Sequence, residues 1–256
     1  MAALSISCIC LTYGRVDFLE EALYSFINQE YEGESELIIV NDYSEQTLVF
    51  NHPKVRIFNF TGQFATIGAK VQFAVDQAKY DVIATTDDDD IGLSNHLKNI
   101  NKLFVKGTTV LHWAKGIFWN EPHITEIMFL GNSGVVYTKQ AIEQIGGVPV
   151  ENAGYDTTMV DRIHTLGIEK TVWAEPSSPS WFYRWGFISK PCYHQSGQGT
   201  DTADKPDILL RHSSHIELLR QQGKIPEGRI VLNPHWDMDY ELQYRNFKTI
   251  KDHGTP

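Results

Sequence analysis

The first 90 residues alternate between stretches typical of β-strands and stretches typical of α-helices, and no other feature limits the fold as strongly. In residues 16–31 the apolar side chains recur at helical spacing, whereas residues 4–11 form a short apolar run rich in strand-forming residues. The same criteria give strands at 35–42, 54–60 and 81–87 and a helix at 67–79. This order predicts an α/β fold in which helices flank a mostly parallel central sheet.

Acidic residues follow two of these expected strands. Asp42 ends the strand at 35–42, and four consecutive aspartates begin where the strand at 81–87 ends. The carboxyl ends of parallel strands meet at one edge of a sheet, and ligands of such folds bind beyond that edge. We therefore expect Asp42 and the aspartate run to lie close together in a binding site.

The aspartate run, Asp87 to Asp90, places four like charges side by side and needs a source of positive charge. Aspartates that alternate along a chain leaving a strand can share a hard cation such as Mg²⁺ or Mn²⁺. Such a cation would in turn hold the phosphates of a substrate. The alternative is a solvated acidic turn. An EF-hand calcium loop fits poorly, because the run lacks the D-x-[DN]-x-[DN]-G pattern.

The composition argues against several classes of protein. The net charge of the 256 residues is −10, and there is no cluster of lysine and arginine that could hold a nucleic acid. The three cysteines form no CxxC pair, so the sequence gives neither a disulfide framework nor a zinc signature. No stretch approaches the roughly 18 to 20 apolar residues of a membrane span. We expect a cytoplasmic protein without a transmembrane segment, and the sequence does not indicate its oligomeric state.

The second half of the sequence is less regular. Residues 109–119 resemble a strand, residues 126–138 a strand or a hairpin, and residues 139–149 and 155–167 helices. Residues 174–206 mix aromatic residues with Pro, Ser and Gly, which is typical of an ordered functional loop. From residue 207 onward the sequence predicts a helix followed by an aromatic tail.

Four segments resemble, in the expected order, the family 2 glycosyltransferases of the GT-A fold. The third of these segments contains the aspartate run. The segments are CLTYGRVDFLEEALYSFINQEY, LIIVNDYSEQT, TIGAKVQFAVDQAKYDVIATTDDDD and GYDTTMVDRIHTLG, and the run corresponds to the DXD motif of the family. The resemblance covers about residues 5–200 and implies a Rossmann-like GT-A domain at 1–205. Its nucleotide-sugar-binding half would be 1–105 and its acceptor half 106–205, followed by a helical and aromatic extension at 206–256.

The resemblance implies a glycosyltransferase of the hexosyltransferase type. Its donor would be a nucleotide-diphosphate sugar, with a UDP-sugar favoured, and its acceptor a hydroxyl group of a glycan or another molecule. It also implies a divalent Mn²⁺ or Mg²⁺ ion and inversion at the anomeric carbon. Gly14, Tyr43, Gln72 and Tyr155 depart from the pattern of the family, which keeps open a relative that binds nucleotide-sugars without transfer. A metal-dependent nucleotidyltransferase is the other alternative, although no Gly-rich, basic signature follows the first strand.

The resemblance also assigns a set of nucleotide-sugar-binding residues: Thr12, Tyr13, Arg15, Asp42, Ser44, Lys70, Asp87 and Asp88. The loop after the first strand would hold the base, and Asp42 would accept hydrogen bonds from the base or the ribose. Lys70 would reach the diphosphate as a point charge. The structural alternatives are an ordinary strand-to-helix turn for the loop, a helix cap or turn former for Asp42, and a surface lysine for Lys70.

The metal ligands implied by the resemblance are Asp87 and Asp89, which have the DXD spacing, together with His194. Asp90 is expected to stand outside the metal site and to fix the following loop. Residues 183–185, before His194, resemble a flexible segment above the donor site of the family. A purely structural histidine is the alternative for His194.

Asp156 matches the general base of the family, which takes a proton from the acceptor hydroxyl as that oxygen attacks the anomeric carbon. It lies at the start of the expected helix 155–167. The alternative is therefore an acid that is stabilised by the positive end of the helix dipole.

Overall fold

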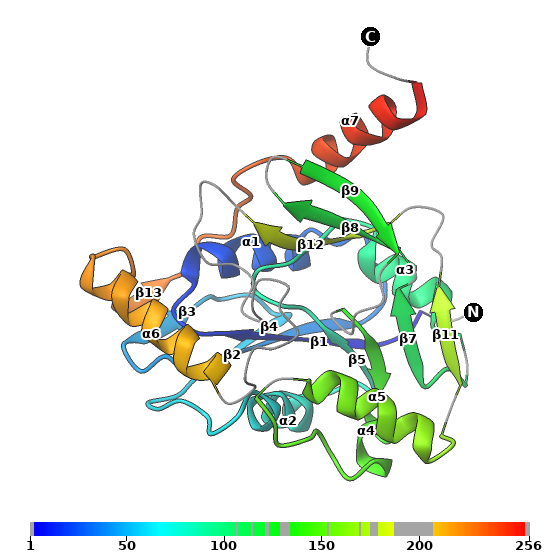
Figure 1. The fold of residues 1–256 in the computed structure, drawn as a ribbon, viewed down its shortest axis with the longest axis horizontal. Helices are drawn as coiled ribbons and strands as arrows, with labels where there is room; N and C mark the ends of the chain where they lie inside the picture. Colours follow the sequence, from blue (N-terminus) through cyan, green and yellow to red (C-terminus); the bar gives the residue numbers. More distant parts are fainter. Residues whose placement is uncertain are drawn as a thin grey trace.

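The computed structural model describes residues 3–105, 107–113, 115–120, 123–128, 134–152, 154–168, 170–174, 179–186 and 207–253 of the chain. Two layers of helices enclose a central sheet, and a second, smaller sheet lies beyond one of these layers (Figure 1). None of the helices within these ranges is long and apolar enough to cross a membrane.

The central sheet has the strand order β11-β7-β10-β5-β1-β2-β4. Its strands are β1 (Ile6–Thr12), β2 (Ser35–Asn41), β4 (Val55–Asn59), β5 (Val82–Thr85), β7 (Val110–Trp113), β10 (Val136–Thr138) and β11 (Thr171–Ala174). β10 is antiparallel to both of its neighbours, and the other neighbouring pairs are parallel. The predicted α/β fold with a mostly parallel sheet is therefore confirmed.

Helices cover both faces of this sheet. α1 (Val16–Ile27) and α3 (His96–Leu103) lie on one face, and α2 (Ile67–Gln77), α4 (Lys139–Gln144) and α5 (Tyr155–Thr165) lie on the other (Figure 1). Successive residues of a strand point to opposite faces, so Cys8 and Cys10 join the core on the α1 side and Ile9 joins the core on the α2 side. Burial on both faces explains why β1 is an almost unbroken apolar run.

The start of α2 packs tightly against the segment that precedes α5. The backbone N–H of Gly68 donates to the carbonyl oxygen of Glu151 at 2.9 Å. A Cβ added at Gly68 would lie 1.8 Å from the carbonyl oxygen of Pro149, so only glycine permits this approach. Thr66 caps the same helix end by accepting a hydrogen bond from the N–H of Ala69 at 3.1 Å. The contact between Gly68 and Glu151 places the start of α5 beside the edge of the sheet.

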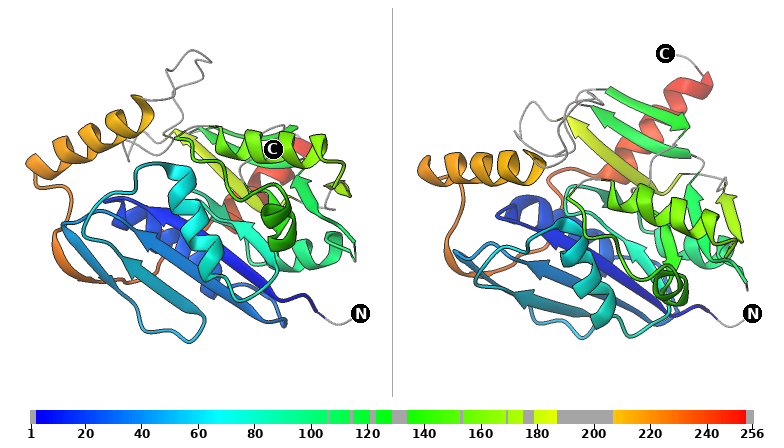
Figure 2. Two further views of the ribbon diagram at one scale, coloured as in Figure 1. Left: turned by 90° about the horizontal axis from the view of Figure 1, so that it is seen from below. Right: turned by 60° about the horizontal axis from the view of Figure 1, so that its bottom comes forward.

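The second sheet has the strand order β6-β12-β8-β9. Its strands are β6 (Ile91–Gly92), β8 (Lys115–Asn120), β9 (His123–Met128) and β12 (Trp181–Gly186). α7 (Tyr240–His253) lies against this sheet (Figure 2). The core between them is largely aromatic and includes Trp119, Phe182, Tyr240 and Tyr244. Since β6 begins directly after the aspartate run, the turn from β5 to β6 joins the two sheets.

The C-terminal part of the chain also contacts the first half of the sequence. α6 (Asp207–Gln221) leads to β13 (Gly228–Val231), which pairs in parallel with β3 (Gln46–Val49). Ile216 and Ile225 pack in one apolar cluster with Tyr43 and Tyr13. The boundary predicted at residue 205 lies outside the described residues.

Candidate functional site

Three neighbouring strands of the central sheet, β1, β2 and β5, end at one edge. Thr12 pairs with Asn41 at the ends of β1 and β2, and Asp42 follows directly. β5 ends at Thr85, shortly before Asp87. The structure therefore brings Asp42, the loop after β1 and the aspartate run to the same edge, as expected from the strand order.

Arg15, in the loop after β1, supplies positive charge to the aspartate run. Its Nη1 donates to Asp89 Oδ2 at 2.9 Å and its Nε donates to Asp88 Oδ2 at 3.2 Å, while Nη2 is paired with Asp88 Oδ1. Burial disfavours the charged guanidinium, but the two carboxylates outweigh this effect and raise the pKa of Arg15. Asp88 is thus directed toward an arginine of the chain itself.

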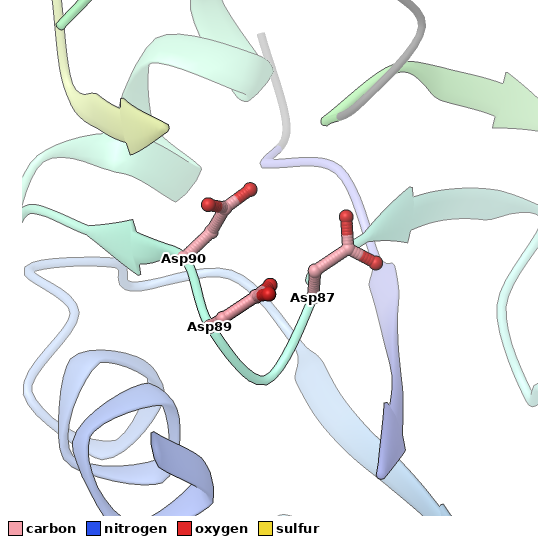
Figure 3. A group of neighbouring side chains, drawn as sticks. All are labelled: Asp87, Asp89 and Asp90. Atoms are coloured by element: carbon pink, nitrogen blue, oxygen red, sulfur yellow. The ribbon is translucent and has the colours of Figure 1, made fainter. Parts of the chain in front are cut away.

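Asp87, Asp89 and Asp90 form a second group within the same turn. Each offers a carboxylate oxygen, and these oxygens lie within 4.8 Å of one another. Figure 3 shows Asp89 pointing across the turn toward Asp87. Burial, followed by repulsion from Asp89 and Asp88, raises the pKa of Asp87 to about 7. Burial and the neighbouring carboxylates therefore disfavour the charged form of Asp87, although Arg15 pairs with Asp89.

This group fits a hard divalent cation. Oxygen ligands lie about 2.0–2.6 Å from Mg²⁺ or Ca²⁺, so ligands on opposite sides of such an ion are about 4–5 Å apart. Asp90 is 2% exposed, and its buried Oδ2 has no hydrogen-bond partner among the described residues. Asp90 was expected to fix only the following loop. Its Oδ1 does accept from the N–H of Arg184 at 3.1 Å, but its carboxylate also belongs to the candidate metal group.

Lys70 of α2 is buried and paired with Asp42. Its Nζ donates to Asp42 Oδ1 at 2.5 Å and to the carbonyl oxygen of Thr12 at 2.7 Å. The other carboxylate oxygen of Asp42 accepts from the N–H of Phe64 at 2.9 Å. Burial lowers the pKa of Lys70, and the nearby Asp42 and Asp88 carboxylates oppose this shift. Lys70 is therefore not a surface lysine, and it holds Asp42 in one orientation.

The remaining residues of the predicted nucleotide site have different surroundings. Tyr13 contacts the ring of Tyr43 edge-on, with the ring centroids 5.0 Å apart. The Thr12 side chain is hydrogen-bonded to Asp88. Ser44 is exposed and donates to Glu45 Oε1 at 3.1 Å. His194 lies outside the residues that the structure describes.

Asp156 lies in the first turn of α5, after Gly154, which has a left-handed conformation with φ of 72°. Its Oδ1 accepts from the N–H of Thr157 at 2.9 Å, which is a local contact of the helix start. Asp156 and Asp87 line the same cavity of about 30 Å³, together with Tyr137 and Tyr155. A cavity of this size has room for about two water molecules. The structure thus brings the predicted base close to Asp87, one of the predicted metal ligands.

The sequence analysis missed Arg184, which contacts the aspartate turn, and its partner Glu21. Residues 183–185 were expected in a flexible segment, but Tyr183 and Arg184 lie in the strand β12. Arg184 is fully buried and pairs with Glu21 of α1. Glu21 sits in a charged Glu-Glu pair on a helix, where the sequence gives no sign of burial. Its partner lies 163 residues away, so no local pattern could reveal the contact.

Comparison with solved structures finds GT-A glycosyltransferases of low sequence identity. S. aureus TarS 1–349 matches with a TM-score of 0.54 at 15% identity, over 71% of this chain and 60% of that chain. Its complex with UDP-GlcNAc matches with a TM-score of 0.56 at 15% identity, over 97% and 80%. The mannosyltransferase PcManGT from Pyrobaculum calidifontis, in complex with GDP-Man and Mn²⁺, gives 0.54 at 13% identity, over 88% and 67%. In the first of these alignments the chain spans less than two thirds of the length of its neighbour. The likeness to these structures confirms the predicted GT-A fold.

No curated protein matches the sequence. The family model described as glycosyl transferase family 2 matches residues 7–159. That range contains all the residues proposed above for the nucleotide, the base and the metal, except His194. This chain therefore belongs to glycosyl transferase family 2.

Proposed function

We propose that the chain transfers a sugar from a nucleotide-diphosphate donor to a hydroxyl group of an acceptor, with the help of a divalent metal ion. The observation that carries the proposal is the group of three carboxylates, Asp87, Asp89 and Asp90, of which Asp87 lines one cavity together with Asp156. The neighbours in complex with UDP-GlcNAc and with GDP-Man support a nucleotide-sugar as the donor. The Mn²⁺ in the second of these supports a divalent ion.

Asp87, Asp89 and Asp90 would hold the metal ion, and His194 remains a further candidate ligand. When bound, the ion would neutralise the charge that develops on the departing diphosphate. All three donors are carboxylate oxygens, which suit Mg²⁺ and Mn²⁺ better than softer metals. Asp88 would not be a ligand in this arrangement, because its two oxygens face Arg15. Arg15 would keep the charge of Asp88 balanced whether or not the ion is bound.

The nucleoside would bind over the ends of β1 and β2. Each oxygen of Asp42 already accepts one hydrogen bond, and each carboxylate oxygen can accept a second one from a base or a ribose. Lys70 would act by fixing Asp42 rather than by reaching the diphosphate. Thr12 and Tyr13 would complete this part of the site. Ser44 is left out of the proposed site, because it is exposed and bonded to Glu45.

Asp156 would act as the general base. It would take the proton of the acceptor hydroxyl while that oxygen forms a bond to the anomeric carbon. The bond between the anomeric carbon and the diphosphate would break on the opposite side, so the anomeric configuration would invert. Asp87, one of the proposed metal ligands, and Asp156 line one cavity, which supports this reaction, because the leaving group and the attacking oxygen must be close together.

The experiment is a panel of nucleotide-sugars incubated with the protein and Mn²⁺ or Mg²⁺. We expect slow hydrolysis of one donor and thermal stabilisation by the corresponding nucleoside diphosphate. Asp156→Asn should abolish hydrolysis and transfer while nucleoside diphosphate binding is retained. Asp161→Asn is the matched control, because Asp161 is an exposed acid of the same helix. Failure of every donor to bind, with or without metal, would exclude the proposed donor site.

One observation favours a second candidate, a protein that binds nucleotide-sugars without transferring the sugar. The hydrogen bond from Thr157 N–H to Asp156 Oδ1 would also be expected of an acid that only stabilises the start of α5. In that case Asp156→Asn would lower the melting temperature, and the wild-type protein would bind the donor without consuming it.

A further inference from the structure

The segment between β13 and the start of α7 contacts a buried glutamate of α1. The hydroxyl of Tyr240, at the start of α7, donates to Glu21 Oε1 at 2.8 Å. Glu21 is fully buried in α1 and also accepts from the backbone N–H of Asp237 at 3.2 Å. The Nε1 of Trp236 donates to the carbonyl oxygen of Glu21 at 3.2 Å. The C-terminal segment is thus bound to one buried glutamate of α1.

Arg184 of β12 is the cation of this buried cluster. Its Nη1 donates to Glu21 Oε2 at 2.5 Å and to the Tyr240 hydroxyl at 2.8 Å. Its guanidinium also lies over the ring of Phe18, 5.2 Å from the centroid. A guanidinium is planar and its donors have fixed directions. The contacts with Glu21 and Tyr240 therefore determine where the rest of the Arg184 side chain points.

The same arginine contacts the aspartate turn. Its Nε donates to the carbonyl oxygen of Asp89, and its backbone N–H donates to Asp90 Oδ1 at 3.1 Å. Asp89 and Asp90 are two of the three carboxylates in the candidate metal group. A connected set of hydrogen bonds therefore joins Tyr240 in α7, through Arg184 in β12, to the turn between β5 and β6.

We propose that Arg184 is a positioning residue for the metal site, and that the C-terminal segment holds Arg184 in place through Tyr240. The inference rests on the proposed function, because it assigns the support of the same metal site. Arg184 fixes the backbone of Asp89 and the carboxylate of Asp90, which keeps the three carboxylates at a separation that one ion can bridge. In an interior that excludes water these hydrogen bonds strengthen one another, so the loss of one member affects the others. The donor site is then complete only when α7 is in place.

Packing alone is the competing explanation, because α7 also covers the aromatic core of the second sheet. Tyr244 allows the two explanations to be separated. It lies on the same helix, is 6% exposed, and belongs to the same core as Tyr240. Its hydroxyl donates to Glu126 Oε1 at 2.7 Å, on β9, which is not part of the hydrogen-bond path to the aspartate turn. Tyr240→Phe and Tyr244→Phe therefore remove the same group from the same core.

The experiment titrates the protein with Mn²⁺ alone and measures free Mn²⁺ by electron paramagnetic resonance. Removal of groups that orient metal ligands commonly weakens metal binding by about 10–100-fold. Because Tyr240 acts through Arg184, we expect Tyr240→Phe to raise the Mn²⁺ dissociation constant by about five- to tenfold. Tyr244→Phe should leave the constant unchanged. Glu21→Gln keeps the shape of the cluster but removes the charge that holds Arg184, and it should weaken Mn²⁺ binding as Tyr240→Phe does.

Circular dichroism and thermal unfolding without metal establish that each variant is folded. Equal Mn²⁺ affinity in the wild type, Tyr240→Phe and Glu21→Gln would overturn the inference. Equal weakening by Tyr240→Phe and Tyr244→Phe would overturn it as well, since the effect would then come from packing. In both cases the proposed function stands, because the wild type binds the metal. Absence of Mn²⁺ binding by the wild type would instead overturn the metal-dependent function and the inference together.

Discussion

Arg15→Met tests whether Arg15 neutralises the aspartate run in the protein without metal. The side chain of Arg15 is 12% exposed and that of Asp88 is fully buried. Removing one partner of a buried ion pair costs about 3–5 kcal/mol, because the other charge stays buried without its counterpart. We expect about 3 kcal/mol, the lower end of that range, because Asp89 is 10% exposed and Thr12 still bonds to Asp88.

For a chain of this length a loss of about 3 kcal/mol lowers the melting temperature by about 6–12 °C. The assay is thermal unfolding in the presence of EDTA at neutral pH, with urea unfolding to obtain the free energy. Mn²⁺ should raise the melting temperature of Arg15→Met by more than that of the wild type. The reason is that the ion replaces part of the positive charge that the variant has lost.

Arg56→Met is the control for the removal of an arginine from an ion pair. Arg56 Nη1 lies 3.2 Å from Glu36 Oε2, but its side chain is 32% exposed and Glu36 keeps hydrogen bonds from Ser7 and Lys79. Its loss should cost no more than about 1 kcal/mol. Should Arg15→Met be no less stable than Arg56→Met, the account of how the aspartate run is neutralised is wrong.

Three further predictions concern residues around the site. Burial lowers the pKa of His96 to about 4. The His96 imidazole takes up a proton near pH 6.5 in the unfolded chain but only near pH 4 in the folded chain. The free energy of unfolding should therefore fall by up to about 3 kcal/mol as the pH drops from 6.5 to 4. His96→Gln should reduce this dependence in urea unfolding measured across that pH range. Lys70→Met leaves the buried Asp42 without its cation and should destabilise the protein by about 3 kcal/mol in urea unfolding. The same variant should bind the nucleoside diphosphate more weakly in calorimetry. Gly68→Ala should cost about 1–3 kcal/mol through overpacking. Gly62→Ala should be neutral in thermal unfolding, because among the described residues only its chain neighbours lie within 4 Å of the added Cβ.

The first half of the fold could be predicted because its elements carry strong local patterns. The expected strand at 35–42 is β2 (Ser35–Asn41), and the expected helix at 67–79 is α2 (Ile67–Gln77). The second half of the fold was harder to predict, because its strands are divided between two sheets. The single strand expected at 109–119 is two strands, β7 and β8, which belong to different sheets. Periodicity identifies a strand but does not tell which sheet the strand joins.

The site could be located from the sequence more accurately than its contacts could be assigned. The expectation that the acids after β2 and β5 lie at the same edge of the sheet follows from the order of strands and helices alone. By contrast, the pairing of Arg15 with Asp88 joins residues 73 positions apart, and that of Arg184 with Glu21 joins residues 163 positions apart. Such contacts depend on how the two sheets and α7 pack together. The sequence also could not separate Asp88, which faces Arg15, from Asp90, which joins the candidate metal group.

The most direct test of the central claim is a crystal structure with Mn²⁺ and the nucleoside diphosphate that stabilises the protein most. Anomalous scattering at the manganese edge locates the ion independently of any interpretation of the site. We predict one strong peak between Asp87, Asp89 and Asp90, with the diphosphate bound to the same ion and the nucleoside beside Asp42. A peak elsewhere on the chain, or a bound diphosphate with no manganese at these carboxylates, would contradict the account.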